Sequence, residues 1–198
     1  MTTGAETADG MDDESGGSGG GGFDRRSLLR YGLAGALSLA AGPAMATPRI
    51  RPERSLHLVN VHTGESFRDV YWSHGRYIRP ACRRIDWLMR DFHVDRIHHI
   101  DPDLIDLLHA ITARLQTRQP LQILSGYRSP ETNRALQEEG FGASNNSMHL
   151  VGKAADITLP GVRLGYLRRA AAASRAGGVG YYPDNGFVHV DTGRVRFW

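Results

Sequence analysis

The chain has 198 residues, 40% of them hydrophobic, which is enough for one buried core and too little for two independent domains. Its formal net charge of +3 is compatible with many polyanions and singles out none of them. The single cysteine, Cys82, excludes an internal disulfide and is predicted to be a small buried side chain rather than a nucleophile.

The first 46 residues are predicted to lie outside the folded domain. Residues 1–22 are rich in glycine and acidic residues and have almost no large apolar side chains, which is typical of disorder. Arg25-Arg26, a short apolar run over residues 31–41 and Ala44-Met45-Ala46 then follow in the order of a twin-arginine export signal cleaved after Ala46. The alternative is an ordinary amphipathic start to a cytosolic protein.

Export would place the mature domain, residues 47–198, in the periplasm and argues against a nucleic-acid partner. The apolar run is shorter than the roughly 20 residues of a membrane-spanning helix. A lipoprotein would need a cysteine at the cleavage point, and Cys82 lies far downstream. No permanent membrane anchor is therefore expected.

The first half of the domain is predicted to form a hairpin and two helices. Residues 55–72 contain two β-prone runs around Gly64, which indicates a hairpin at a sheet edge. Apolar residues recur at helical spacing over 80–92. Asp101-Pro102 supplies an N-cap and a first-turn proline for a second helix that ends near Leu115.

The second half alternates strands and helices without a regular βαβ repeat, which predicts an α+β fold. The expected strands are residues 121–124, 154–159 and 187–191, and the expected helices are residues 131–139 and 162–176. The polar segment 141–148 is expected to be a loop that delivers His149.

His149, Asp156 and His189 form the candidate metal site. Two imidazoles and a carboxylate suit a catalytic zinc with one position left for water, and the ligand types favour zinc over other divalent ions. The chain has nine histidines, however, so spacing alone leaves other triples open.

The segment 147–156 has the order S-x-H-x-x-G-x-A-x-D, followed by a histidine on a later predicted strand. This order resembles that of the D-alanyl-D-alanine metallopeptidases, which share their fold with the signalling domain of hedgehog proteins. Ser125-Gly126-Tyr127-Arg128-Ser129 and residues 177–198 resemble the murein DD-endopeptidases of the MepK type. The resemblance covers most of residues 80–198.

The resemblance implies a hedgehog/DD-peptidase-like α+β fold, with a small antiparallel sheet flanked by helices. It makes His149, Asp156 and His189 the ligands of one Zn²⁺ per chain and places Arg128 beside the scissile bond. An arginine there can hold a carboxylate or stabilise an oxyanion, although it can also be a surface residue paired with an acid. Tyr127 and Ser147 are candidate substrate contacts, and the alternative for Tyr127 is a structural role.

The general base is less well indicated. Many members of the family carry an acid three residues before the last histidine ligand, where this chain has Gly186. Asp191 is the preferred substitute, because on an extended strand it shares a face with His189. Asp184, in the turn before the strand, is the second candidate. Asp191 has an alternative role, which is to hydrogen-bond a histidine and fix its tautomer.

The sequence thus predicts an exported zinc murein endopeptidase that acts on peptidoglycan cross-links containing D-amino acids. A carboxypeptidase that removes terminal D-alanine is the nearest alternative. A zinc-containing domain that binds the cell wall without catalysis is the other. The sequence does not indicate an oligomeric state.

Overall fold

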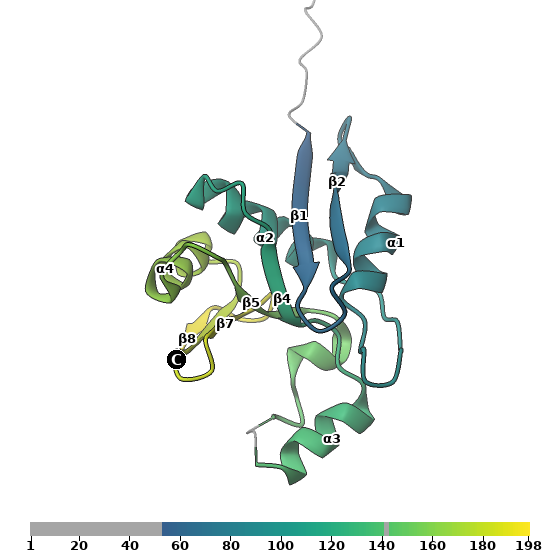
Figure 1. Cartoon of the computed structure of the whole chain (residues 1–198), viewed down its shortest axis with the longest axis vertical. Helices are drawn as coiled ribbons and strands as arrows, with labels where there is room; N and C mark the ends of the chain where they lie inside the picture. The colour runs from purple at the N-terminus through teal and green to yellow at the C-terminus, as the bar shows by residue number, and fades with distance from the viewer. Residues whose placement is uncertain (1–52, 141–142) are drawn as a thin grey trace, which may run out of the picture. The chain divides into compact units, whose positions relative to one another are not determined.

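The computed structural model describes residues 53–140 and 143–198. The predicted disordered tail, the export signal and the cleavage site after Ala46 lie outside these residues. The described part contains one eight-stranded sheet in the order β3-β2-β1-β4-β5-β7-β6-β8 (Figure 1). Its strands are β1 (Arg54–Asn60), β2 (Ser66–Ser73), β3 (Arg76–Tyr77), β4 (Leu121–Ser125), β5 (Ala154–Thr158), β6 (Gly178–Tyr182), β7 (Phe187–Asp191) and β8 (Arg196–Phe197).

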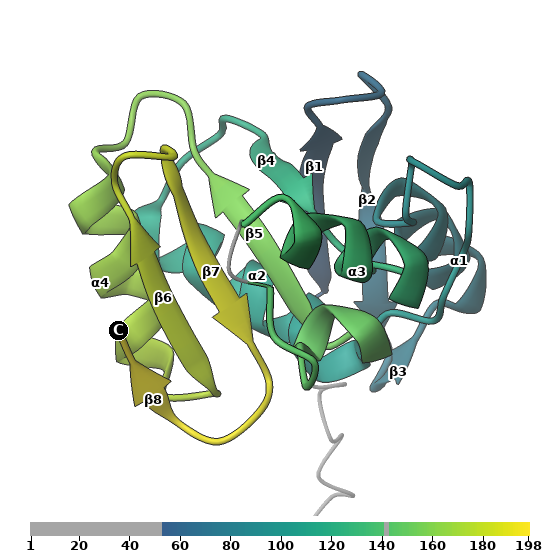
Figure 2. The same cartoon turned by 90° about the horizontal axis from the view of Figure 1, so that it is seen from below.

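Helices lie on both faces of this sheet. Figure 2 shows α2 and α4 on one face and α3 on the other. The helices are α1 (Arg79–Leu88), α2 (Pro102–Leu115), α3 (Pro130–Glu138) and α4 (Leu164–Ser174), and a short 3-10 helix, η1, spans Met148–Val151. The predicted α+β class is confirmed.

The sheet differs from the predicted small antiparallel one in size and in strand direction. β1 pairs with β4 in parallel, and β6 pairs with β8 in parallel, while the other pairings are antiparallel. The parallel β1–β4 pair is possible because α1 and α2 lie between these strands in the chain and supply the long crossover that parallel strands need. Four further elements, β3, β6, β8 and η1, were not predicted from the sequence.

Helix boundaries follow the capping residues. The Asp101 carboxylate accepts a hydrogen bond from the Asp103 amide at the start of α2, as predicted. Ser129 caps α3 by accepting from the Thr132 amide. The first predicted helix ends early, at Leu88, so that Phe92 lies in the connection between α1 and α2 rather than on a helical face.

Side chains alternate across the sheet and divide the core from the functional face. On β7, Val188 and Val190 are fully buried in the core, so His189 and Asp191 lie on the opposite face. The core is formed by aliphatic residues of α1, α2, α4 and the central strands; Cys82 belongs to it, and burial raises the pKa of its thiol. Within residues 53–140 and 143–198, none of the helices combines the length and the apolar character needed to cross a membrane.

Candidate metal centre

Strand pairing brings Asp156 and His189 together. β5 and β7 are antiparallel, and Asp156 is directly opposite His189 in their register. Residues opposite each other in a sheet project from the same face, with Cβ atoms about 5 Å apart. The two side chains therefore meet on the face that the core does not use.

His149 reaches the same point from η1. The Ser147 hydroxyl accepts a hydrogen bond from the His149 amide and so caps this short helix. The His149 ring is almost completely buried, and its Nδ1 donates to the Gly126 carbonyl oxygen at 2.7 Å. The Arg128 amide donates to the His149 carbonyl oxygen at 3.1 Å, which ties η1 to the segment after β4. The predicted loop thus delivers His149 through a helical turn.

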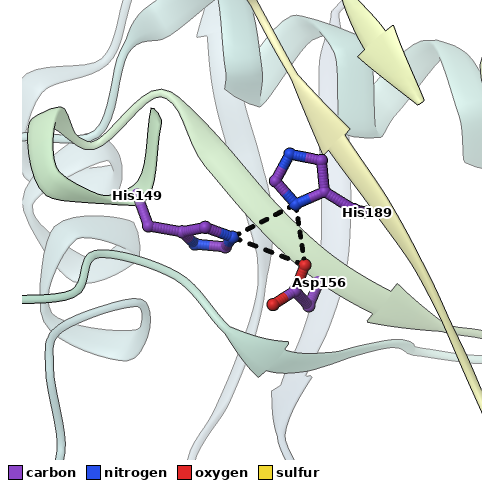
Figure 3. Close-up of side chains that lie close together, drawn as sticks. All are labelled: His149, Asp156 and His189. Atoms are coloured by element: carbon purple, nitrogen blue, oxygen red, sulfur yellow. Dashed lines mark hydrogen bonds and ion pairs between the residues drawn. The ribbon is translucent and has the colours of Figure 1, made fainter. Parts of the chain in front are cut away.

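The three side chains point toward one another (Figure 3). Nδ1 of His189 is 2.9 Å from Oδ1 of Asp156 and 3.2 Å from Nε2 of His149, and that Nε2 is 3.4 Å from the same Asp156 oxygen. Ligand atoms bound about 2.0–2.1 Å from a tetrahedral zinc are themselves roughly 3.4 Å apart. The spacing of these three atoms therefore fits one small divalent metal ion.

Hydrogen bonds on the outer side of each ring fix the tautomers. His149 Nδ1 must donate, because its partner is a carbonyl oxygen, and His189 Nε2 donates to Oδ2 of Asp191 at 3.1 Å. When both rings are neutral, Nε2 of His149, Nδ1 of His189 and the Asp156 carboxylate all present lone pairs to one point. Three acceptors cannot satisfy one another, so the cluster needs a proton or a cation.

Asp191 is fully buried and surrounded by donors. Its Oδ1 accepts from the amides of Gly178 and Gly193, and Arg196 donates to both of its oxygens in addition to the bond from His189. A carboxylate with this many bonds has little capacity left to take a proton from water. This environment favours the orientation of His189 over the predicted role of general base.

The charges of the cluster are strongly coupled. Burial opposes ionisation of Asp156, but His149 and His189 outweigh it and hold the pKa of this carboxyl well below its usual range. Burial also opposes a charged His189, yet its hydrogen bonds to Asp156 and Asp191 raise its pKa. Before a metal binds, the cluster therefore favours a proton on His189.

Arg128 lies at the edge of the triad. Its guanidinium is 3.5 Å from Oδ2 of Asp156 and donates to the Ser125 hydroxyl at 3.3 Å. Burial lowers the pKa of Arg128, and the charges of Asp156 and Asp91 partly offset this effect. The side chain is only 13% exposed, so its charge acts where little water screens it.

A cavity of about 350 Å³ opens over the triad. Its walls come from the segment before η1, from η1, from β7 and from the carboxyl-terminal residues. In one of these walls, Trp198 Nε1 donates a hydrogen bond of 2.8 Å to the Tyr182 hydroxyl. A Cβ atom at Gly180 would lie 2.7 Å from the Trp198 ring, so only glycine leaves room for this wall. The cavity is lined by Arg128, Ala143, Ser144, Asn146, Ser147, Met148, His149, Asp156, Tyr182, Phe187, His189, Arg196 and Trp198.

Two of the other predicted site residues, Asp184 and Tyr127, do not line this cavity. Asp184 is exposed in the turn before β7 and does not line it. Tyr127 is buried, stacks on His98 with ring centroids 4.6 Å apart, and borders a neighbouring cavity instead. Ser147 lines the cavity and also caps η1, so it serves the local fold as well.

The family profile described as peptidoglycan L,D-endopeptidase MepK matches residues 49–198. The chain belongs to this family. It is 40% identical to the peptidoglycan L,D-endopeptidase MepK of Escherichia coli K12 over 176 residues, which cover 88% of this chain and 97% of that protein. The probable MepK of Haemophilus influenzae is 35% identical over 88% of this chain and 94% of its own length.

Membership makes the chain a peptidase and confirms the predicted resemblance to the MepK type. The relatives are named as L,D-endopeptidases, whereas the sequence motifs resemble those of the D,D type. A solved structure, the L-Ala D-Glu endopeptidase ChiX of Serratia marcescens, is 20% identical with a TM-score of 0.32, covering 38% of this chain and 62% of that one. A likeness this weak does not bear on the site.

Sequence reasoning missed the roles of two residues near the carboxyl end. Arg196 neutralises Asp191, and Trp198 forms a wall of the cavity with its ring 5.5 Å from that of His189. The available signal was Gly178, where a Cβ atom would collide with the Asp191 carboxylate. A glycine on a strand often marks such a close approach, but it does not say what approaches.

Proposed function

We propose that this member of the MepK family is a zinc-dependent L,D-endopeptidase of peptidoglycan, with His149, Asp156 and His189 as the metal ligands. The observation that carries the proposal is the cluster of three inward-facing acceptors at the base of an open cavity. The names of the relatives support the substrate and the L,D specificity.

Each residue has a distinct task in this proposal. A zinc ion held by the triad would supply a Lewis acid for the scissile carbonyl and an activated water. Asp191 and the Gly126 carbonyl hold the two imidazoles in the tautomers that present lone pairs to the metal. Arg128 donates to the substrate carbonyl oxygen as negative charge develops there.

We also propose that the protein acts in the periplasm after export by the twin-arginine route, with cleavage after Ala46. The support is the order of the paired arginines, the apolar run and the small residues before position 47. Relatives that act on peptidoglycan suggest a periplasmic or extracellular location, which agrees with export.

Digestion of purified peptidoglycan tests the proposed activity. The domain from residue 47 is incubated with murein, with and without a chelator, and again after zinc is restored. We expect new termini at L,D bonds, as identified by mass spectrometry, loss of cleavage with the chelator and recovery with zinc. His189→Ala should be inactive in all three conditions. Binding without cleavage by the zinc-loaded wild type would instead show a non-catalytic wall-binding domain.

A further inference from the structure

A second cavity, of about 270 Å³, lies beside the metal centre and has a different character from the first. Arg128, Asp156 and Phe187 line both cavities, so the two meet at the triad. The second cavity is walled by the β1–β2 turn, the connection between α1 and α2, the end of β4 and the inner side of α3. A peptide that crosses the metal centre therefore has space on both sides of the scissile bond.

Apart from Arg128 and Asp156 at the triad, the charged groups of the second cavity are already paired. Arg90 is 7% exposed and donates to Glu65 and Asp95, and Asp91 is 2% exposed and accepts from the amides of Ser129 and His93. These groups have little capacity left for a charged ligand. Away from the triad, the second cavity offers a ligand mainly the half-buried apolar surface of Phe92, Leu124, Leu136 and Phe187.

The apolar surface is held in place before any ligand arrives. The Phe92 ring packs against two imidazoles, with centroid distances of 4.3 Å to His62 and 4.1 Å to His93. His62 is fixed in turn by a hydrogen bond of 3.0 Å between its Nε2 and the Leu124 carbonyl oxygen. A preformed apolar wall gains binding energy with little loss of side-chain freedom.

The first cavity offers a different set of groups. It presents the hydroxyls of Ser144 and Ser147 and the amide of Asn146, together with the Tyr182–Trp198 wall. The two sides of the triad thus suit substrate segments of different chemistry. One side suits polar groups, and the other suits an aliphatic side chain.

We propose that the cavity between Phe92 and Leu136 is the subsite for an aliphatic side chain on one side of the scissile bond, and that it determines specificity there. This inference rests on the proposed peptidase function, because it takes the substrate to be a peptide that crosses the triad. It assigns binding roles to α3 and to the connection between α1 and α2.

The test uses short blocked L,D-dipeptides whose scissile amide is N-methylated so that they are not cleaved. Two matched pairs carry leucine or serine, one pair at the L position and the other at the D position. Calorimetry on the zinc-loaded wild type should show about tenfold tighter binding of leucine at one position and a smaller difference at the other. Equal binding of leucine and serine at both positions overturns the inference, as does binding of none of the peptides.

Variants assign the preference to the cavity. Leu136→Ala should abolish most of the leucine preference at that position, and Leu136→Met, which keeps the apolar area, should retain it. Phe92→Ala should act in the same direction as Leu136→Ala. Tyr166→Ala is the matched control, because Tyr166 is 50% exposed on α4 and lines neither cavity. A preference that survives in both Leu136→Ala and Phe92→Ala overturns the assignment, with circular dichroism confirming that the variants are folded.

These experiments distinguish failure of the proposed subsite from failure of the proposed peptidase function. If the wild type discriminates between the methylated peptides but cleaves neither the unmethylated peptides nor peptidoglycan, the subsite stands and the peptidase proposal fails. If it cleaves peptidoglycan but shows no leucine preference at either position, the subsite fails and the peptidase proposal stands.

Discussion

Two carboxylates, one half-buried on α2 and one buried on β5, show how similar groups have different roles. Asp106, on α2, accepts from Arg54 at 2.6 Å and from the hydroxyls of Tyr71 at 2.7 Å and Tyr77 at 2.9 Å. Asp156, on β5, faces two imidazole nitrogens and an open cavity. The first site is satisfied by the protein alone, whereas the second is not.

The difference lies in the donors. Arginine and tyrosine keep their protons at neutral pH, and burial together with Asp106 raises the pKa of Tyr77 to about 12. Imidazoles can give up a proton near neutral pH and then become metal ligands. A carboxylate with permanent donors stabilises the fold, and one with exchangeable donors beside a cavity can bind a cation.

The largest expected effect comes from Asp156→Asn. This change keeps the shape but removes the negative charge that a zinc ligand supplies, so we expect zinc affinity and peptidoglycan cleavage to fall by about a thousandfold or more. Metal analysis and the rate of release of soluble muropeptides measure the two effects. Cleavage at the wild-type rate would remove Asp156 from the ligand set.

Asp191→Asn should have the next largest effect. An amide at this position holds His189 and Arg196 less well, and the loss of an outer carboxylate on a metal-bound histidine typically costs about 10- to 100-fold in metal affinity. Competition with a chromophoric chelator measures it. If zinc affinity is unchanged and only the rate of catalysis falls, Asp191 is the general base after all.

Asp106→Asn should change stability and leave zinc binding intact. Hydrogen bonds to a charged group contribute about 1.5–3 kcal/mol, so we expect a loss of about 2 kcal/mol in the free energy of unfolding at pH 7. Urea denaturation measures it, with zinc stoichiometry as the control. Reduced zinc binding in a folded Asp106→Asn protein would contradict the separation of the two sites.

The Asp106 contribution should also depend on pH. Burial opposes ionisation, but the bonds from Arg54, Tyr71 and Tyr77 outweigh it and lower the pKa of this carboxyl. The stabilisation is therefore complete above the pKa of the unfolded state, about 3.9, and is lost as pH falls through the lower folded value. The difference in stability between wild type and Asp106→Asn should shrink in acid. A constant difference from pH 7 to pH 2 would contradict this account.

The smallest change in the free energy of unfolding is expected at an exposed ion pair. Arg84 and Asp69 are 2.8 Å apart, but each side chain is more than half exposed. Such pairs contribute about 0–1 kcal/mol, so Arg84→Ala should change the free energy of unfolding by no more than about 0.5 kcal/mol at 0.15 M salt. A loss as large as that of Asp106→Asn would show that exposure does not separate these carboxylates.

Local signals in the sequence predicted much of this fold. Capping by Asp101, the hairpin around Gly64 and strand β7 follow from neighbouring residues, and each agrees with the structure. The two-residue strands β3 and β8 are too short for periodicity to reveal them. The parallel β1–β4 pairing joins segments far apart in the chain and leaves no local pattern.

The same limit applies to the site. The motif around His149 and Asp156 predicted which side chains meet, because the resemblance carries their order. It did not predict that His189 would use Nδ1 toward the triad and Nε2 toward Asp191, since this depends on strand register and ring rotation. Nor did it show that Arg196 would occupy the free side of Asp191, which weakens the case for a base there.

Zinc titration of the metal-free protein tests the central claim most directly. The wild type and Asp106→Asn should each bind one zinc per chain with the same affinity, measured by competition with a chromophoric chelator. His149→Ala, Asp156→Ala and His189→Ala should each lose this tight site while remaining folded. Tight binding of one zinc by any of these three variants, at the wild-type affinity, would contradict the assignment of the metal centre.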